Sequence, residues 1–232
     1  MNTSAIIVAL SWLTPHLGKL WRAQISGRSI LEHIIENCTK SGVIDKFCVM
    51  TDDVGLMEHG QDLGAPIFPC PEIDKDIPLN SLSIELYSLY REYYMVQQIG
   101  MHEDLTFFIP WNMPLLNGRT LEKMYHTLLD DPLAARIIPI SPIDPHLFTK
   151  LEGSGEFFPV WGHKALDRQL IQPLFHLSYA SIVHWQRLFK AIPKLAGITI
   201  DKTRFFTVES EQDVELAEYL YNYALRKDEC PA

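Results

Sequence analysis

The sequence predicts a three-layer α/β protein with a mainly parallel, Rossmann-like sheet and helices on both of its faces. Over the first two thirds of the chain, short β-type runs alternate with longer segments of helical periodicity, which is the pattern of successive β-α units. The chain has 232 residues, of which 47% are hydrophobic and 21% charged, an ordinary globular composition and a size that suits one large domain. We therefore expect a single domain over residues 1–232.

The first two β-α units can be followed along the chain. Ala5–Leu10 is a continuous apolar run and is the first expected strand. Ser29–Ser41 places its apolar residues near helical spacing and ends before Gly42, which suits the left-handed conformation that often follows a helix. Phe47–Met50 is the second expected strand, and Asp53 follows it as the N-cap of a second helix.

The same alternation continues beyond the second helix. Pro66–Cys70 is a short extended segment, and Leu79–Gln98 is expected to form a long helix because its apolar residues follow a helical pattern. Leu105–Ile109 is the fourth expected strand, and Gly118–Leu129 is the helix after it. Ala135–Ile140 is the fifth strand.

The last part of the chain is less regular. Between Ser141 and Ile182, Gly, Pro and aromatic residues interrupt the pattern, and an inserted region of this kind often lines a binding cleft or a dimer contact. A short helix is expected over Trp185–Ala191, with β-type pieces at Ile198–Ile200 and Arg204–Phe206. Ser210–Leu225 has one apolar face and is the expected C-terminal helix.

Composition argues against several classes of function. The 20 Lys and Arg residues are outnumbered by 29 Asp and Glu residues, and the net charge of −9 makes nucleic acid an unfavourable partner. No stretch approaches the roughly 18 to 20 apolar residues that a membrane span needs, and no Lys or Arg precedes the first apolar run as in a signal peptide. We therefore expect a cytoplasmic protein with no membrane partner. The four cysteines lack zinc-site spacing and are expected to be free thiols: Cys38, Cys48, Cys70 and Cys230.

Ligands of open α/β sheets bind at the carboxyl ends of the strands, so the segments after the first, second and fourth strands are the candidate site. The segment after the first strand contains Gly18 and Lys19, and the Lys19 ammonium could neutralise a phosphate or could simply be solvated. Neither a dinucleotide-binding fingerprint nor a P-loop is present.

The other two segments carry acidic and amide side chains. Asp52 and Asp53 follow the second strand, where an Asp is often a helix cap. Asn112 follows the fourth strand, where its amide would bind Mg²⁺ more weakly than a carboxylate or would bond its own turn. Glu209 precedes the last helix and is either a metal ligand or a charge that complements the helix dipole.

Taken in order, these segments resemble the sugar-acid cytidylyltransferases, the family of the CMP-sialic acid and CMP-Kdo synthetases within the nucleotide-diphospho-sugar transferase fold. The resemblance covers nearly the whole chain and depends on the order and spacing of short pieces. The last of them is similar to the family's closing Ile-Asp-Thr-Glu-Glu-Asp-Leu-Glu-Leu-Ala-Glu signature. The pieces are Ala5–Ile7, Gly18–Lys19, Ser26–Leu31, Val49–Asp53, Leu63–Ala65, Asn112–Leu116 and Val208–Glu218.

The resemblance implies a reaction and a set of site residues. The anomeric hydroxyl of a sugar acid, acylneuraminate-like or Kdo-like, would attack the α-phosphate of CTP for surface-glycan synthesis, with Mg²⁺ and basic side chains neutralising the departing pyrophosphate. A homodimer formed through the insertion is also implied. The implied residues are Lys19 on phosphate, Glu209 on the metal, Arg168 and Gln169 on the sugar, and Leu10, Ser11, Thr51, Asp52 and Asn112 around the substrate.

The chain also departs from the family pattern at the nucleotide site. Leu10 stands where the family has a phosphate-binding Arg, and Trp12 stands where the backbone should approach phosphate closely. Thr207 and Glu209 replace an Asp-x-Asp pair, and Asn112 stands where related enzymes have Asp. Nucleotidyl transfer depends on positioning and charge neutralisation. The second expectation is therefore a catalytically inactive family member that acts as a binding or scaffold subunit.

Overall fold

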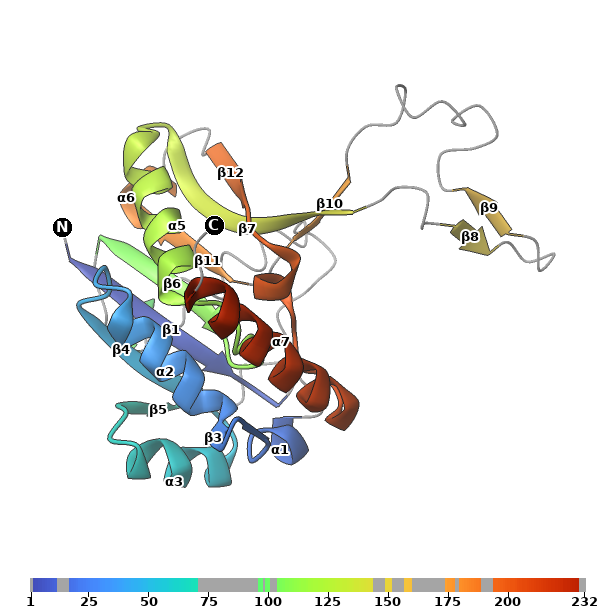
Figure 1. Ribbon diagram of the computed structural model, residues 1–232. Coiled ribbons are helices and arrows are strands. Elements are labelled where there is room, and N and C mark those ends of the chain that lie inside the picture. The colour runs from blue at the N-terminus through green and yellow to red at the C-terminus, as the bar shows by residue number, and fades with distance from the viewer. Residues whose placement is uncertain are drawn as a thin grey trace.

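Helices cover both faces of one central sheet in the computed structural model (Figure 1). The structure describes residues 2–11, 17–70, 96–97, 99–100, 104–143, 149–151, 157–159, 174–177, 180–188 and 194–229. Helices α2 (Ile30–Lys40), α5 (Gly118–Asp130) and α7 (Glu211–Glu229) contribute buried residues to the core on one face. Helix α6 (Trp185–Leu188) and Val96 pack on the other face. The predicted three-layer arrangement is confirmed.

The sheet is mainly parallel, as predicted. Strand β1 lies at its centre between β4 and β6 and is parallel to both, and β5 extends the parallel region beyond β4. On the other side, β11 runs antiparallel between β6 and β7, β10 is antiparallel to β7, and β12 is parallel to β7. The strands are β1 (Thr3–Ala9), β4 (Lys46–Thr51), β5 (Ile67–Pro69), β6 (Leu105–Pro110), β7 (Ala134–Ile143), β10 (Leu174–Leu177), β11 (Ser181–His184) and β12 (Lys194–Thr199).

Two small hairpins lie outside this sheet. Strands β2 (Gln24–Ile25) and β3 (Arg28–Ser29) pair antiparallel directly before α2. Strands β8 (Thr149–Leu151) and β9 (Phe157–Pro159) pair with each other as a separate two-stranded sheet. The second hairpin lies within the segment 141–182 that the sequence marks as an insertion.

The helix boundaries follow from capping side chains that the sequence displays. The Ser29 hydroxyl accepts from the Glu32 amide at 3.2 Å, and the Glu32 carboxylate accepts from the Ser29 amide at 2.5 Å, which is a complete capping box at the start of α2. Gly42 has φ +67° just beyond the end of that helix. Asp53 caps α3 (Val54–Asp62), as predicted, and Asn117 caps α5.

The structure corrects two expected elements in the last third of the chain. Arg204–Phe206 was expected as a strand, but Arg204 and Phe205 lie in a 3-10 helix, η3 (Lys202–Phe205), and Phe206 follows it. The reason is local: the Asp201 carboxylate accepts from the Thr203 amide at 2.8 Å and from its hydroxyl at 2.7 Å, which favours a turn. The expected strand Ile198–Ile200 begins earlier, as β12, and the expected helix from Trp185 is described only to Leu188, as α6.

Two other expectations concern the segment 141–182 and the long helix Leu79–Gln98. The segment 141–182 was expected to be irregular, yet β7 extends into it to Ile143 and it contains β8, β9 and β10. Most of the expected helix Leu79–Gln98 lies outside the described residues, and residues 96–97 at its end are helical.

The described cysteines are buried and free, which agrees with the sequence expectation. Cys38, Cys48 and Cys70 form no disulfide, and Cys230 lies outside the described residues. Burial raises the pKa of the Cys38 and Cys48 thiols to about 12, so neither is a reactive thiolate near neutral pH. In the part of the chain that the structure describes, no helix combines the length and apolar character needed to cross a membrane.

Candidate functional site

The carboxyl ends of β1, β4 and β6 meet at one edge of the sheet. Ala9 of β1 pairs with Thr51 of β4, and Val8 pairs with Pro110 of β6, so the residues that follow these strands come to the same level. Helix α1 (Leu17–Leu20) and the first turn of α7 lie at this end of the sheet (Figure 1). This is the edge at which an open α/β sheet binds ligands.

Ser11 and Asp52 are joined directly across this edge. The Ser11 amide donates to Oδ1 of Asp52 at 2.8 Å, and the Ser11 hydroxyl donates to Oδ2 at 2.5 Å. Ser11 is exposed, and Asp52 is half-buried. Both hydrogen-bond donors of Ser11 are therefore occupied by the carboxylate of Asp52.

Asp53 caps the start of α3 and lies near Gly18 of α1. Its Oδ1 atom accepts from the Leu56 amide at 2.8 Å, and its own amide donates to the buried Thr51 hydroxyl at 3.1 Å. A Cβ atom at Gly18 would lie 3.5 Å from the other carboxylate oxygen, Oδ2. Asp53 is thus a helix cap, which is one of the roles that its position after a strand indicated.

Asn112 links the end of β6 to the segment before α7. Its backbone carbonyl oxygen accepts from the Val208 amide at 2.9 Å, and its side-chain Nδ2 donates to the Val208 backbone carbonyl at 3.4 Å. Only 6% of Asn112 is exposed. The side-chain amide nitrogen thus bonds a segment distant in sequence, a contact that the sequence did not indicate.

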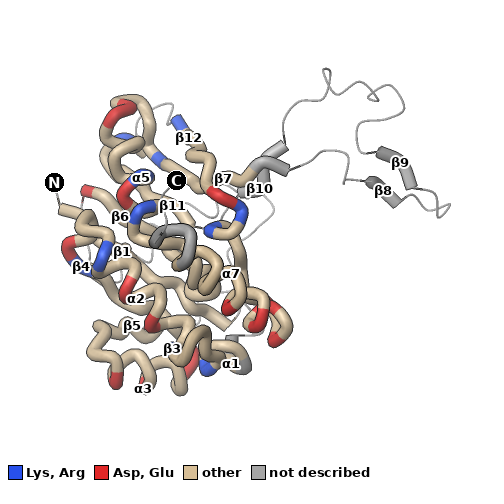
Figure 2. The backbone as a smooth tube through the Cα atoms, viewed as in Figure 1, with Lys and Arg blue, Asp and Glu red and all other residues tan. Residues whose placement is uncertain are grey.

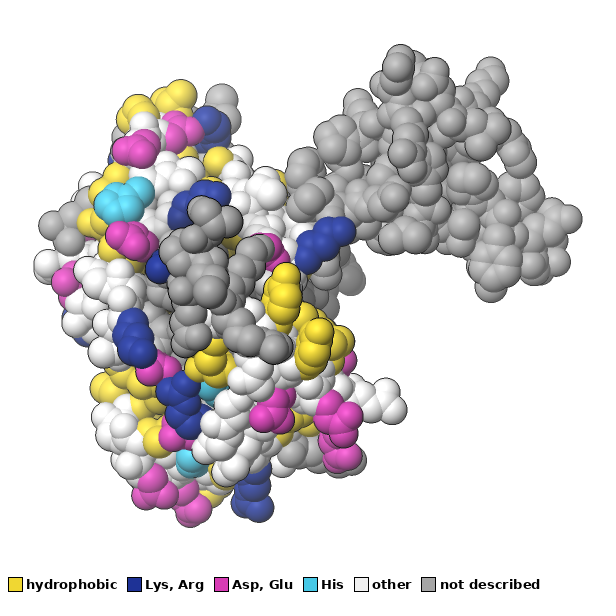
Figure 3. Space-filling model, viewed as in Figure 1, with side chains coloured by type: hydrophobic (Ala, Val, Ile, Leu, Met, Phe, Trp, Pro, Cys, Tyr) yellow, Lys and Arg dark blue, Asp and Glu magenta, His cyan; other side chains and the backbone are white. Residues whose placement is uncertain are grey.

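Glu209 follows Val208 and therefore lies at the same edge. Its side chain is exposed, and its amide donates to Oδ2 of Asp213 at 3.0 Å. The same oxygen accepts from the Ser210 amide and hydroxyl, each at 2.8 Å, so Asp213 closes the turn in which α7 begins. Acidic side chains dominate this end of α7 (Figures 2 and 3).

The other predicted site residues are placed as follows. Leu10 is entirely buried in the core beside Ile6 and Met50, so any contact of Leu10 with a ligand would have to be made by its backbone. Thr51 is also fully buried. Lys19 lies in α1, but its side chain is outside the described part, as are Arg168 and Gln169 altogether.

The described acidic residues do not form a ready metal site. Among the residues that the structure describes, no group of three or more His, Cys, Asp or Glu side chains is placed to hold a metal ion. Glu209 directly follows Val208, which is hydrogen-bonded to Asn112. One carboxylate and one amide therefore belong to this edge. Mg²⁺ prefers octahedral oxygen coordination and commonly takes several ligands from phosphates and water. This edge fits such an ion only when a nucleotide supplies most of its ligands.

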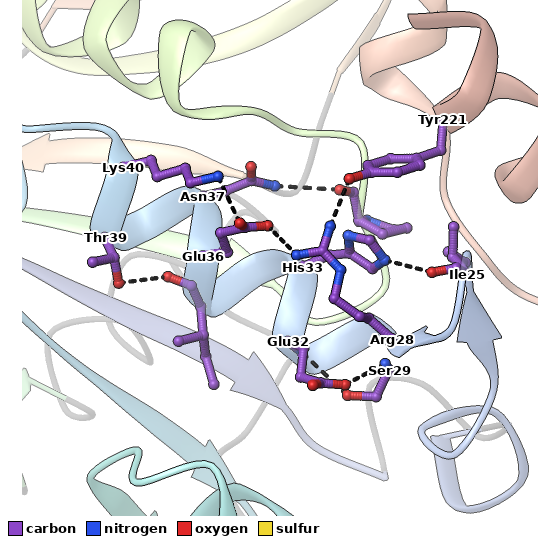
Figure 4. A network of polar contacts seen from close by, with 12 residues as sticks. Ile25, Arg28, Ser29, Glu32, His33, Glu36, Asn37, Thr39, Lys40 and Tyr221 are labelled. Carbon is purple, nitrogen blue, oxygen red and sulfur yellow. Dashed lines mark hydrogen bonds and ion pairs between the residues drawn. The ribbon is translucent and has the colours of Figure 1, made fainter. Parts of the chain in front are cut away.

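Sequence reasoning missed a polar network that fastens the β2–β3 hairpin to α2 and α7 (Figure 4). Arg28 donates to the Glu36 carboxylate at 2.6 Å and to the Tyr221 hydroxyl at 2.7 Å. The Tyr221 ring also meets the buried His33 ring edge-on, with centroids 4.7 Å apart. The available signal was the turn dipeptide between Ile25 and Arg28, because a two-residue turn of this kind predicts a hairpin.

Comparisons with known proteins agree with this architecture. No protein-family model matches the chain. In sequence, the chain is 23% identical over 120 residues to 3-deoxy-manno-octulosonate cytidylyltransferase of Chlamydia pneumoniae, and this match spans 51% of the chain and 42% of that protein. The matched part is thus less than half of that relative.

The structural likeness extends over almost the whole chain. CMP:2-keto-3-deoxy-manno-octonic acid synthetase complexed with CTP has a TM-score of 0.68 at 11% identity, covering 97% of this chain and 100% of that one. The 4-diphosphocytidyl-2C-methyl-D-erythritol synthase of Anaerococcus prevotii has a TM-score of 0.62 at 10% identity, covering 95% and 96%. The chain therefore has the α/β fold of the nucleotide-diphospho-sugar transferases, and its sequence is similar to that of a sugar-acid cytidylyltransferase.

Proposed function

We propose that the protein is a cytidylyltransferase that transfers CMP from CTP to a sugar acid of the acylneuraminate or Kdo type. The observation that carries the proposal is the coincidence of two likenesses. The weak sequence match is to a cytidylyltransferase for 3-deoxy-manno-octulosonate, and the structural likeness is to a synthetase for the same sugar acid complexed with CTP. Two independent comparisons therefore indicate the same nucleotide and the same class of sugar.

The reaction needs positioning and charge neutralisation more than covalent chemistry from the protein. The anomeric oxygen of the sugar acid would form a bond to the α-phosphorus while the bond to pyrophosphate breaks. We place CTP over the carboxyl ends of β1, β4 and β6, the edge of the sheet that carries the Ser11–Asp52 pair and Asn112. Lys19 would neutralise phosphate charge, and Arg168 and Gln169 would contact the sugar.

Mg²⁺ is part of the proposal, and Glu209 is the side chain that would help to hold it. Glu209 is an exposed carboxylate, and Asn112 fixes the neighbouring Val208 at the end of β6. When bound, the ion would neutralise the charge that develops on the departing pyrophosphate. The protein itself contributes the position of Glu209, which is set by the Asn112–Val208 bonds and by the Asp213 cap of α7.

A transfer assay tests this function. The purified protein is incubated with CTP, Mg²⁺ and either Kdo or N-acetylneuraminate, and pyrophosphate and the CMP-sugar are measured. We expect one sugar acid to be used, and Glu209→Gln to reduce the rate at least tenfold, because each loss of about 1.4 kcal/mol of charge stabilisation in the transition state lowers a rate tenfold. Asp62→Asn, at the far end of α3, is the matched control that removes an exposed carboxylate elsewhere.

A second candidate, a binding or scaffold subunit without catalysis, is favoured by one observation. Leu10, which stands where the family has a phosphate-binding Arg, is completely buried in the core and brings no charge to the site. If this candidate is right, no CMP-sugar forms, and calorimetry detects no CTP binding that depends on Mg²⁺. Metal-dependent binding or any turnover excludes it.

We further propose that the protein is a homodimer that works in the cytoplasm in surface-glycan synthesis. The support for the dimer is the β8–β9 hairpin, a two-stranded sheet separate from the main sheet and within the segment implied as the dimer contact. Light scattering tests it: a monomer mass that persists at high protein concentration contradicts the dimer. Cell fractionation tests the location.

A further inference from the structure

The Ser11–Asp52 pair places an acidic side chain at a position suited to a phosphate. A backbone amide and a hydroxyl at the end of a strand are groups that commonly bind phosphate oxygens in α/β proteins. In this protein both groups of Ser11 are used by the two oxygens of one carboxylate, at 2.8 and 2.5 Å. Asp52 therefore makes the two contacts that an anionic ligand would otherwise make.

The neighbouring Asp53 increases the negative charge at the same place. One of its oxygens caps α3 through the Leu56 amide, and the other faces Gly18, where a Cβ atom would lie 3.5 Å away. Asp52 thus contacts Ser11, and Asp53 lies near Gly18, so the two carboxylates lie near two described residues that follow β1. A phosphate at Ser11 would therefore face the negative charge of Asp52, which is followed in sequence by a second one at Asp53.

We propose that Asp52 is an internal anion that holds the phosphate-binding groups of Ser11 and competes with a phosphate of the nucleotide. The inference rests on the proposed function, because it takes CTP to bind at this edge of the sheet. Nucleotide binding then requires the Ser11–Asp52 bonds to break, and the charge of Asp52 lowers the affinity for any polyphosphate. Asp52 acts on affinity as an inhibitory contact and not as a substrate-binding residue.

Neutral replacements of Asp52 test the proposal, with inorganic pyrophosphate and CTP as probes. Asp52→Asn keeps the shape and an oxygen acceptor but removes the charge, and Asp52→Ser supplies a smaller neutral acceptor. We expect each variant to bind pyrophosphate about tenfold more tightly than the natural protein in titration calorimetry, because like charges a few ångströms apart at a surface oppose binding by about this factor or more. Thermal melting confirms that both variants are folded.

Asp62→Asn is the matched control, since it changes the net charge equally from an exposed position at the far end of α3. Its pyrophosphate affinity should stay within twofold of the natural protein. Unchanged or weaker binding by both Asp52 variants overturns the proposal, and so does an equal gain in Asp62→Asn.

The outcome is separable from that of the proposed function. If the Asp52 variants gain affinity for pyrophosphate and no protein forms a CMP-sugar, the internal-anion role stands and the transferase assignment fails. If the natural protein transfers CMP and the variants bind both probes as it does, the assignment stands and the internal-anion role fails.

Discussion

Replacing Asn112 by Asp tests how the edge of the sheet is held together. The change leaves the size of the side chain unaltered and keeps the backbone bond from the Val208 amide to the Asn112 carbonyl. It removes the Nδ2 donor, whose hydrogen bond to the Val208 carbonyl is 3.4 Å long. Asn112 is only 6% exposed. A carboxylate would then face a carbonyl oxygen with little access to water.

The magnitude can be worked from these contacts. A neutral hydrogen bond contributes about 1 kcal/mol, and a buried polar group that loses its partner costs a further 1–3 kcal/mol or so, with more for a charge. We therefore expect Asn112→Asp to lower the free energy of unfolding by about 2–4 kcal/mol at pH 7. Asn112→Ala, which loses the bond without adding charge, should lower it by less, and the difference between the two variants isolates the charge.

Urea denaturation of the natural protein and both variants supplies the measurement. At pH 4.5 the deficit of Asn112→Asp should shrink, because the new carboxyl group can take up a proton and donate again. If Asn112→Asp is within about 0.5 kcal/mol of the natural protein in its free energy of unfolding at pH 7, this reasoning is refuted. The loss of a buried hydrogen bond should lower that free energy by a measurable amount. On sequence grounds, Asn112→Asp with Leu10→Arg should strengthen Mg²⁺-dependent CTP binding if the site holds a nucleotide. The structure adds that this double variant should be destabilised, because Leu10 is entirely buried.

Three further predictions concern the hairpin and α7. Burial lowers the pKa of His33 below its ordinary 6.5, so the unfolded state binds the proton more readily than the folded state. The stability of the fold should therefore decrease as the pH drops below about 6.5. Urea midpoints at pH 5.5 and 7.5 check this, and the difference between them should be smaller in His33→Gln. Tyr221→Phe removes the acceptor of Arg28 but keeps the ring beside His33, and should cost about 1 kcal/mol in the same assay. Gly27→Ala, at φ +78° with open space around it, should lower the melting temperature through backbone strain of about 1 kcal/mol; an unchanged melting temperature would contradict that cause.

Local signals explain why most of the fold could be predicted. The β-α alternation, the Asp53 cap and Gly42 after α2 depend on residues close in sequence, and each is confirmed. The partners of the candidate site residues could not be predicted, because they depend on contacts between distant segments. Ser11 and Asp52 are 41 residues apart, and Asn112 and Val208 are 96 apart.

The acidic character of the site edge predicts how Mg²⁺ would arrive. Glu209 follows Val208, the partner of Asn112, whereas Asp52, Asp53 and Asp213 each accept a hydrogen bond from a backbone amide. In the described part of the chain no three such groups converge on one point, so these residues alone offer Mg²⁺ too few ligands for firm binding.

A nucleoside triphosphate changes the number of ligands available to Mg²⁺, because its phosphates supply oxygen atoms. Its negative charge is also repelled by the net charge of −9 of the chain unless a cation is present. We therefore expect calorimetry to detect no binding of Mg²⁺ to the protein alone, and to detect CTP binding only at Mg²⁺ concentrations that saturate the nucleotide. Binding of Mg²⁺ before nucleotide would show that the ligands come from the protein, and the acidic edge would then be a preformed metal site. Tight binding of metal-free CTP would instead show that basic side chains neutralise the triphosphate, and Lys19→Met would be the variant that abolishes it.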